Sequence, residues 1–424
     1  MRALTILEGG NLIDGKGRFI RDAIVVIDDS KIAQAGSAAE TKIPPGKNRE
    51  IELNGMTVMP GLIDVHVHLH GQSDPLTMVS LLSETDAYQA TILAENAHRT
   101  IEAGFTTVRD MGAPNDVNID LSRAVNDGIL KGPRIIPAAT IDMTMVPGDR
   151  DIHGLKGGQV TGPAEARKAA RMKIACGAEV IQVNATGASF GKYGPKVLIL
   201  SVEEMRGAIE ETHKLGKMST THACGSEGIK NAVLAGVQCV EHGQWLYEDD
   251  DLIRIMAEQR VGWVPTLMNG FWKLEKIKDE ERKGRKSGLP KYVMERAVQM
   301  VEPHRKSFEK AMQKGIVIGY GTDVGSPFTP NGMNAYEMEM FVKYGATPMQ
   351  AIEAATRINA KIIRMDNKIG TVEVGKEADF TIVDGNPLDD VKILQKKENI
   401  ALVMKGGETV VDRLGLMGPH TGLM

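Results

Sequence analysis

The sequence has few cysteines, no long apolar run and no excess of positive charge. Three cysteines in 424 residues exclude the disulfide framework of small secreted proteins. The net charge of −4 gives no general attraction to nucleic acids or anionic lipids. No window approaches the roughly 18 apolar residues of a membrane span, and the N-terminus lacks a signal-peptide pattern. We therefore expect a cytoplasmic protein without nucleic-acid or membrane partners.

Strand and helix patterns divide the chain into two parts. Both ends consist of short strand-like runs separated by Gly, Asp and Asn, which predicts a discontinuous β-sandwich domain from residues 1–58 and 366–424. Between them, residues 59–365 alternate eight apolar strand candidates with helix-period segments. This alternation predicts an α/β fold, a parallel (β/α)8 barrel. A very polar stretch from Leu274 is expected to be an exposed excursion or lid after the seventh strand.

A pair of histidines follows the pattern of the first barrel strand. In "GLIDVHVHLH", His66 and His68 are two residues apart, and alternate residues of a barrel strand point inward. If Val65 and Val67 face the surrounding helices, both imidazoles face the barrel interior. Two unrelated surface histidines at a strand end are the alternative explanation of this pair.

Three further candidates lie at the ends of other predicted strands. His222 lies in "MSTTHAC", His242 in "CVEHG" and Asp323 in "IGYGTD", and the carboxyl ends of barrel strands form the catalytic mouth. Imidazoles and a carboxylate suit Zn²⁺, and also Mn²⁺, Fe²⁺ or Co²⁺. The predicted metal ligands are His66, His68, His222, His242 and Asp323. Asp323 could also take a proton from a bound water.

Together these motifs resemble the amidohydrolase superfamily. The resemblance rests on His-X-His after "MPGLID", on "EHG" and "GTD", and on the closing "GTVEVGKEADFTIVDGNPLDDV". It is greatest for the imidazolonepropionase-like and Xaa-Pro or Xaa-Arg dipeptidase-like branch, which includes hydrolases of phenylureas, thiocarbamates and ochratoxin. The resemblance implies a barrel with a β-sandwich and a homo-oligomer.

The resemblance also assigns roles to the candidate residues. It implies that His66, His68 and Asp323 bind the more buried metal, that His222 and His242 bind a second one, and that Asp323 is the general base. If only one metal binds, His222 or His242 is left to stabilise the oxyanion, which makes His242 a catalytic candidate besides a metal ligand.

The fourth predicted strand departs from the family pattern. "VIQVNATG" places Gln182 where close relatives carry a carboxylated, metal-bridging lysine. Without that anion, two close divalent cations repel strongly in a low-dielectric site, so we expect one tightly bound metal, Zn²⁺ first, and a doubtful second site. Asn184 shares the face of Gln182, and either side chain is a possible metal ligand. Polar filling of the barrel is the alternative.

Two more departures concern the substrate region. Cys224 stands where many relatives have a second histidine on the fifth strand, and the loop after the third strand lacks Gly-Gly-His, with His153 lying later. His153 and Tyr193 are the candidate substrate-binding residues. Apolar residues near predicted loops favour an apolar or aromatic substrate; they are Met143, Met145, Phe190, Trp245, Met268, Phe271 and Trp272.

The function that this sequence predicts is metal-dependent hydrolysis of a C–N bond. Hydroxide formed from metal-activated water attacks an amide, urea or carbamate of a small molecule, and Asp323 passes the proton to the leaving nitrogen. A dipeptide or cyclic amide is the alternative substrate. A metal-dependent decarboxylase or deaminase is an alternative of another class, and a non-catalytic scaffold is the third.

Overall fold

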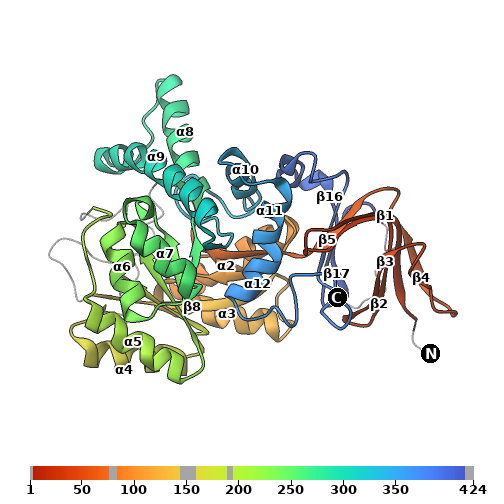
Figure 1. Cartoon of the computed structure of the whole chain (residues 1–424), viewed down its shortest axis with the longest axis horizontal. Helices are drawn as coiled ribbons and strands as arrows, with labels where there is room; N and C mark the ends of the chain where they lie inside the picture. Colours follow the sequence, from red (N-terminus) through yellow and green to blue (C-terminus); the bar gives the residue numbers. More distant parts are fainter. Residues whose placement is uncertain (1–2, 76–83, 144–158, 189–193, 416–424) are drawn as a thin grey trace.

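The computed structural model describes residues 3–75, 84–143, 159–188 and 194–415. Strands from both ends of the chain form one sheet, at the right of Figure 1. The strands are β1 (Thr5–Ile13), β2 (Phe19–Asp28), β3 (Lys31–Ser37), β4 (Arg49–Glu52), β5 (Thr57–Pro60), β15 (Phe380–Val383), β16 (Ile400–Lys405) and β17 (Glu408–Asp412). Their order is β17-β16-β15-β5-β1-β2-β3, and β4 pairs with β1. Antiparallel pairing of β5 with β15 joins the two ends of the chain.

The second sheet is parallel and curls into the barrel. Its strands are β6 (Leu62–Val67), β7 (Phe105–Asp110), β8 (Arg134–Met143), β9 (Gln159–Val160), β10 (Val180–Asn184), β11 (Met218–Ala223), β12 (Cys239–His242), β13 (Gly262–Val264) and β14 (Val317–Ile318). The order is β14-β13-β12-β11-β10-β8-β7-β6, and β9 pairs with β8. The chain after β14 bonds back to β6: His68 N donates to Val324 O at 2.8 Å, and Asp323 N donates to His66 O at 2.8 Å. These bonds bring the eighth strand's end beside the first.

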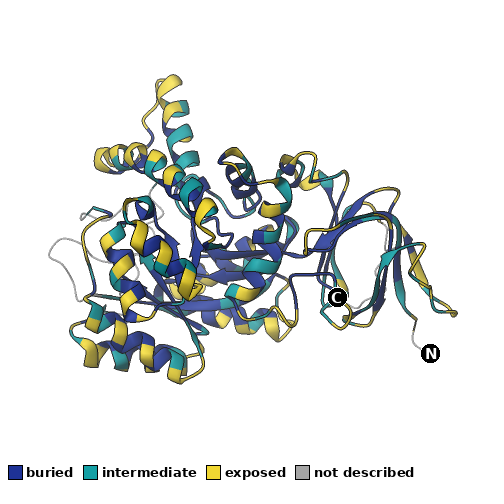
Figure 2. Cartoon of the chain, in the orientation of Figure 1, coloured by how far each residue is buried: buried dark blue, intermediate teal, exposed yellow. Residues whose placement is uncertain are grey.

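Helices cover the outside of the barrel sheet, and Figure 2 shows their outer faces exposed and the strands buried. The helices are α2 (Asp86–Glu102), α3 (Val117–Asn126), α4 (Pro163–Ala175), α5 (Val202–Lys214), α6 (Ser226–Ala235), α7 (Asp250–Gln259), α8 (Leu267–Arg282), α9 (Lys291–Lys314), α10 (Tyr336–Lys343), α11 (Pro348–Glu353) and α12 (Asn359–Ile362). Shorter helical turns are η1 (Pro114–Asp116), η2 (Leu246–Glu248), η3 (Ala354–Ile358), η4 (Val391–Gln395) and η5 (Lys397–Asn399). The strand–helix alternation confirms the predicted barrel with a second, terminal sheet.

The polar segment from Leu274 is mainly helical. It forms the second half of α8 and the turn into α9, and this helical pair stands out from the barrel in Figure 1. In the described part of the chain, no helix combines the length and the apolar character needed to cross a membrane. The predicted domain limit between residues 58 and 59 falls inside β5, and the division itself stays a prediction.

Strand β6 departs from the alternation expected of it. Its pairing with β7 is irregular between Asp64 and Val67, as in a β-bulge, where an added residue shifts the faces of a strand. Val67 packs in the main core, whereas Val65 packs with Cys239 and Val264 in a separate cluster. The cluster of Val65 also contains Ala360 of α12 and Ile363 at its end, so the two valines pack in different clusters, and the side that each faces stays a prediction.

Candidate metal centre

Three side chains from two neighbouring strand ends converge at the mouth of the barrel. His66, His68 and Asp323 each offer one ligand atom, and these atoms lie within 4.8 Å of one another. Asp323 Oδ1 is 3.4 Å from His68 Nε2 and 3.7 Å from His66 Nε2. The bonds between β6 and residues 323–324 hold the two segments in this position.

The spacing of these atoms fits a metal ion. Ligand atoms about 2.0–2.1 Å from a tetrahedral Zn²⁺ stand about 3.3 Å apart, close to the 3.4 Å between His68 Nε2 and Asp323 Oδ1. Two imidazole nitrogens and one carboxylate oxygen are also the donor types that zinc and related divalent metals take. The donor set and its geometry are therefore suitable for a divalent ion.

The other two predicted ligands lie next to this cluster, in a row of histidine rings that continues from His66. The ring centroids of His66 and His242 are 4.8 Å apart, and those of His242 and His222 are 4.5 Å apart. His222 Nε2 lies 3.4 Å from Gly187 O and 3.7 Å from Cys224 Sγ. The structure thus brings together His66, His68, His222, His242 and Asp323, the whole set taken from the sequence.

Unusual backbone conformations turn two of these side chains. On β12, Cys239 and Glu241 share one face and both contact Arg109 inside the barrel, so regular alternation would point His242 outward. His242 instead has φ 69° and Asp323 has φ 58°, the left-handed region that L-residues rarely adopt. Non-glycine residues held there are concentrated at functional sites.

A buried charged network orients His66. Glu241 Oε2 lies 2.8 Å from His66 Nδ1, and Arg109 Nη2 donates to Glu241 Oε1 at 2.5 Å. Thr220 also donates to this carboxylate. Burial opposes the charge of Glu241, but Arg109 and His66 hold its pKa below the ordinary value. A carboxylate on Nδ1 fixes the tautomer of a histidine and leaves Nε2 for a metal. Here that Nε2 is the atom near Asp323.

Hydrogen bonds also fix His242 and Asp323. His242 Nδ1 lies 2.8 Å from Thr266 Oγ1, and burial together with the neighbouring histidines holds the pKa of His242 well below its ordinary value. Ser326 Oγ donates to Asp323 Oδ1 at 3.1 Å, and Asn269 Nδ2 donates to Asp323 O at 3.3 Å. The imidazole is therefore kept neutral, as a ligand must be, and the carboxylate is held in one orientation.

Gln182 and Asn184 lie beside this cluster on β10. In register, Asn184 is opposite His222, and Gln182 is opposite Thr220. The two amides are 7% and 9% exposed, respectively. Their nitrogens donate to the third barrel strand, Gln182 Nε2 to Thr140 Oγ1 at 3.4 Å and Asn184 Nδ2 to Asp142 Oδ2 at 2.8 Å. Both carbonyl oxygens lack a hydrogen-bond partner within the described chain.

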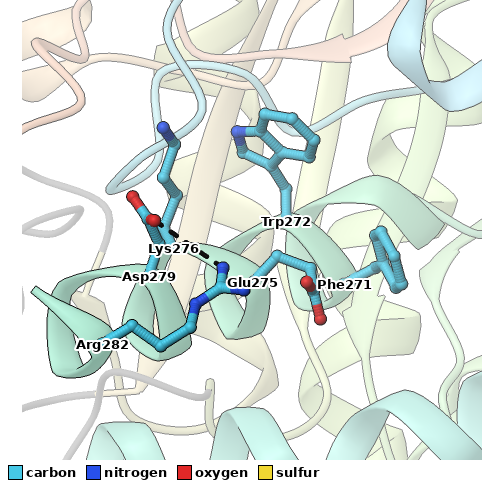
Figure 3. Close-up of a pocket in the computed structure, with 6 residues that line it drawn as sticks. All are labelled: Phe271, Trp272, Glu275, Lys276, Asp279 and Arg282. Atoms are coloured by element: carbon cyan, nitrogen blue, oxygen red, sulfur yellow. Dashed lines mark ion pairs between the residues drawn. The ribbon is translucent and has the colours of Figure 1, made fainter.

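The predicted substrate residues are not gathered in one described pocket. Tyr193, His153, Met145 and Phe190 lie outside the described residues. Trp245 packs with Cys224 and Met300, and Met268 belongs to the main core. Phe271 and Trp272 border a hollow of about 290 Å³ on α8. Figure 3 shows that its lining side chains all come from this helix, with an ion pair between Asp279 and Arg282. No predicted metal ligand borders this hollow.

Sequence reasoning missed the residues that support the ligands. Glu241 precedes His242 in "EHG", so its place in that motif was an available signal. Arg109 and Lys273 carried no such signal, because a charged residue in a strand or helix is usually exposed. Lys273 is 2% exposed and donates to Asn269 Oδ1 at 2.9 Å, and burial lowers its pKa to about 8. It reaches Asp323 electrostatically from the first turns of α8.

Known proteins resemble this chain over almost its whole length. Ochratoxinase from Aspergillus niger is 28% identical, over 96% of this chain and 86% of that protein. The crystal structure of a Xaa-Pro dipeptidase with bound methionine has a TM-score of 0.84 at 30% identity, covering 96% of this chain and 99% of the other. Phenylurea hydrolase B has a TM-score of 0.79 at 20% identity over 99% of both chains, which supports the fold alone.

A family match agrees with these likenesses. The Amidohydrolase family matches residues 57–410, a region that contains every residue of the cluster. The match confirms the resemblance found in the sequence motifs. The chain belongs to the amidohydrolase family and is a hydrolase that acts on C–N bonds.

Proposed function

We propose that the protein hydrolyses an amide, urea or carbamate bond of an apolar or aromatic small molecule with one tightly bound divalent metal, Zn²⁺ first. The observation that carries this proposal is the convergence of His66 Nε2, His68 Nε2 and Asp323 Oδ1. We assign the metal to these three residues, with His222 and His242 as a weaker second pair. The likeness of this chain to ochratoxinase supports this substrate class.

In the proposed hydrolysis, Asp323 transfers the protons, and its neighbours hold it in place. When bound, a divalent ion would lower the pKa of its water toward neutrality and polarise the scissile carbonyl. Asp323 accepts the proton of the attacking water, whose oxygen bonds to the carbonyl carbon. When the C–N bond breaks, Asp323 returns that proton to the leaving nitrogen. Ser326 and Asn269 hold Asp323 during both transfers.

The decisive experiment combines metal analysis with a substrate panel. Purified protein should retain about one equivalent of divalent metal after dialysis, because Gln182 cannot supply the bridging anion for a second ion. Elemental analysis measures this, and a panel of aryl amides, phenylureas and carbamates measures turnover. Two retained equivalents would contradict the one-metal assignment. Turnover of none of these compounds would favour deamination or decarboxylation.

A dipeptidase is the second candidate function. The 30% identity to the Xaa-Pro dipeptidase structure favours it, and dipeptides in the same panel distinguish it by their relative kcat/KM. We further propose that the protein is cytoplasmic and forms a homo-oligomer. Analytical ultracentrifugation tests the second of these, and a single species of 46.0 kDa would contradict it.

A further inference from the structure

The amides of Gln182 and Asn184 are oriented by their neighbours on β8. The Asp142 carboxylate only accepts hydrogen bonds when ionised, so it must face the Asn184 amide nitrogen. Thr140 Oγ1 donates its hydrogen to Met111 O at 3.3 Å, which leaves that oxygen to accept from Gln182 Nε2. Hydrogen bonding therefore fixes both amides, and both carbonyl oxygens are directed away from β8.

These oxygens form an unsatisfied pair beside the metal cluster. Neither oxygen has a hydrogen-bond partner within the described chain, and both side chains are more than nine-tenths buried. Gln182 shares its face with Val180, which packs with Ala138 inside the barrel, whereas Val183 packs outward in the main core. A buried acceptor without a donor is costly. Two of them on one interior face are a site for a ligand that brings donors.

We propose that the carbonyl oxygens of Gln182 and Asn184 accept hydrogen bonds from N–H groups of the substrate. This inference rests on the proposed function and narrows its substrate class to secondary amides and N–H ureas. Prolyl amides and fully N-alkylated ureas lack the donor at the scissile nitrogen. Asn184 is opposite His222 in register, which places its side chain beside one residue of the predicted metal cluster.

A site that hydrogen-bonds a substrate N–H discriminates strongly against analogues without it, because its buried acceptors then stay unpaired. The test compares a secondary anilide with its N-methyl analogue, and a phenylurea with its fully N-methylated form. We expect the wild-type enzyme to prefer the N–H compound by about 100-fold or more in kcat/KM. Asn184→Leu and Gln182→Met should each reduce this preference at least about tenfold, since an apolar side chain of similar size accepts no hydrogen bond.

A stability readout accompanies the kinetics. Each variant removes an unpaired buried oxygen but also the amide N–H that donates to Asp142 or Thr140, so these two effects on the unfolding temperature oppose each other and both variants should stay folded. Thr106→Val is the matched control: Thr106 Oγ1 is also buried without a partner in the described chain, and it lies next to Gly61, outside the cluster. This control should keep the wild-type preference for N–H compounds.

Three results would overturn the inference. The first is an unchanged N–H preference in both variants. The second is loss of a metal equivalent in either variant, because the oxygens would then be metal ligands. The third is an equal dissociation constant for the N–H and N-methyl forms, which calorimetry measures even if the wild-type protein hydrolyses neither member of each pair. Absence of hydrolysis alone would contradict the proposed function and not this inference.

Discussion

The interiors of the two sheets differ in how their buried polar groups are hydrogen-bonded. In the terminal sheet, Thr57 Oγ1 donates to Gly385 O at 2.7 Å and Thr381 Oγ1 donates to Gly104 O at 2.6 Å, and the surrounding cluster is apolar. In the barrel, Gln182 and Asn184 keep unpaired oxygens, and His242 has a left-handed backbone. The terminal sheet also contains single features of this kind, since Thr409 Oγ1 lacks a partner in the described chain and Asp22 has φ 47°. The comparison teaches that in the barrel such local costs adjoin the metal cluster, which is typical of a functional site.

The largest expected effect is the loss of activity when a metal ligand of the barrel is removed. His68→Ala removes one metal ligand, so kcat/KM should fall at least about 1,000-fold, because several kcal/mol of catalysis come from the metal. Kinetics and elemental analysis measure the loss. His98→Ala is the control, since the His98 side chain is 55% exposed on α2 and pairs with Glu102; it should change neither quantity. Full activity of His68→Ala would show that this site is not the reaction centre.

A substitution in the terminal sheet should lower the stability of the protein and leave its activity unchanged. Phe380→Ala removes a fully buried ring from its apolar cluster and should lower the free energy of unfolding by about 3–5 kcal/mol. Denaturant titration measures this, and kcat/KM of the folded fraction should stay at the wild-type value. A selective loss of kcat/KM at full stability would break the distinction between the two interiors.

A smaller effect is expected behind the metal cluster. Glu241→Gln replaces the carboxylate on His66 Nδ1 and should weaken metal binding about 10- to 100-fold, measured by competition with a chelator. The same change leaves Arg109 without its anion, which also destabilises the fold. Glu241→Gln combined with Arg109→Met removes both charges and separates the two effects. Wild-type metal affinity in both proteins would exclude a role for Glu241 in orienting His66.

The smallest effect is expected in the terminal region. The Lys16 ammonium, followed by the Thr371 hydroxyl, lowers the pKa of Glu373 from 4.5 to about 2. A depressed pKa stabilises the folded state above the unfolded pKa, and this contribution is lost as pH falls from about 4.5 through about 2. The Glu373 side chain is 38% exposed, so solvent screening limits the contribution to below about 1 kcal/mol. Glu373→Gln should flatten the pH dependence of unfolding in this window and leave kcat/KM unchanged.

Local patterns were sufficient to predict most of the fold. Helix-period apolar spacing in the sequence predicts helices over Ser226–Ala235 and Lys291–Lys314, and these are the bounds of α6 and α9. Gly236 and Gly315 follow them at φ 95° and 73°, in the left-handed conformation that ends helices. Such signals lie within a few residues of one another, so the sequence carries them without reference to the rest of the fold.

The details of the site depended on contacts between distant segments. Alternation puts Val65 and Val67 on one face of β6, but with the irregular pairing of β6 and β7 they pack in different clusters. Alternation on β12 would have turned His242 outward, and its φ of 69° reverses this. Neither departure follows from period-two reasoning, because both depend on neighbouring strands that the sequence does not show side by side.

The sequence alone therefore determined the strand–helix alternation, the terminal sheet and the residue types of the cluster. These follow from the periodicity of apolar residues and from the chemistry of His and Asp at strand ends. Only the tertiary structure decided which atoms face one another: Nε2 of His66 toward Asp323, Nδ1 of His66 toward Glu241. The reason is that side-chain direction at a strand end depends on backbone conformation and hydrogen bonds made across the barrel, between residues far apart in the chain.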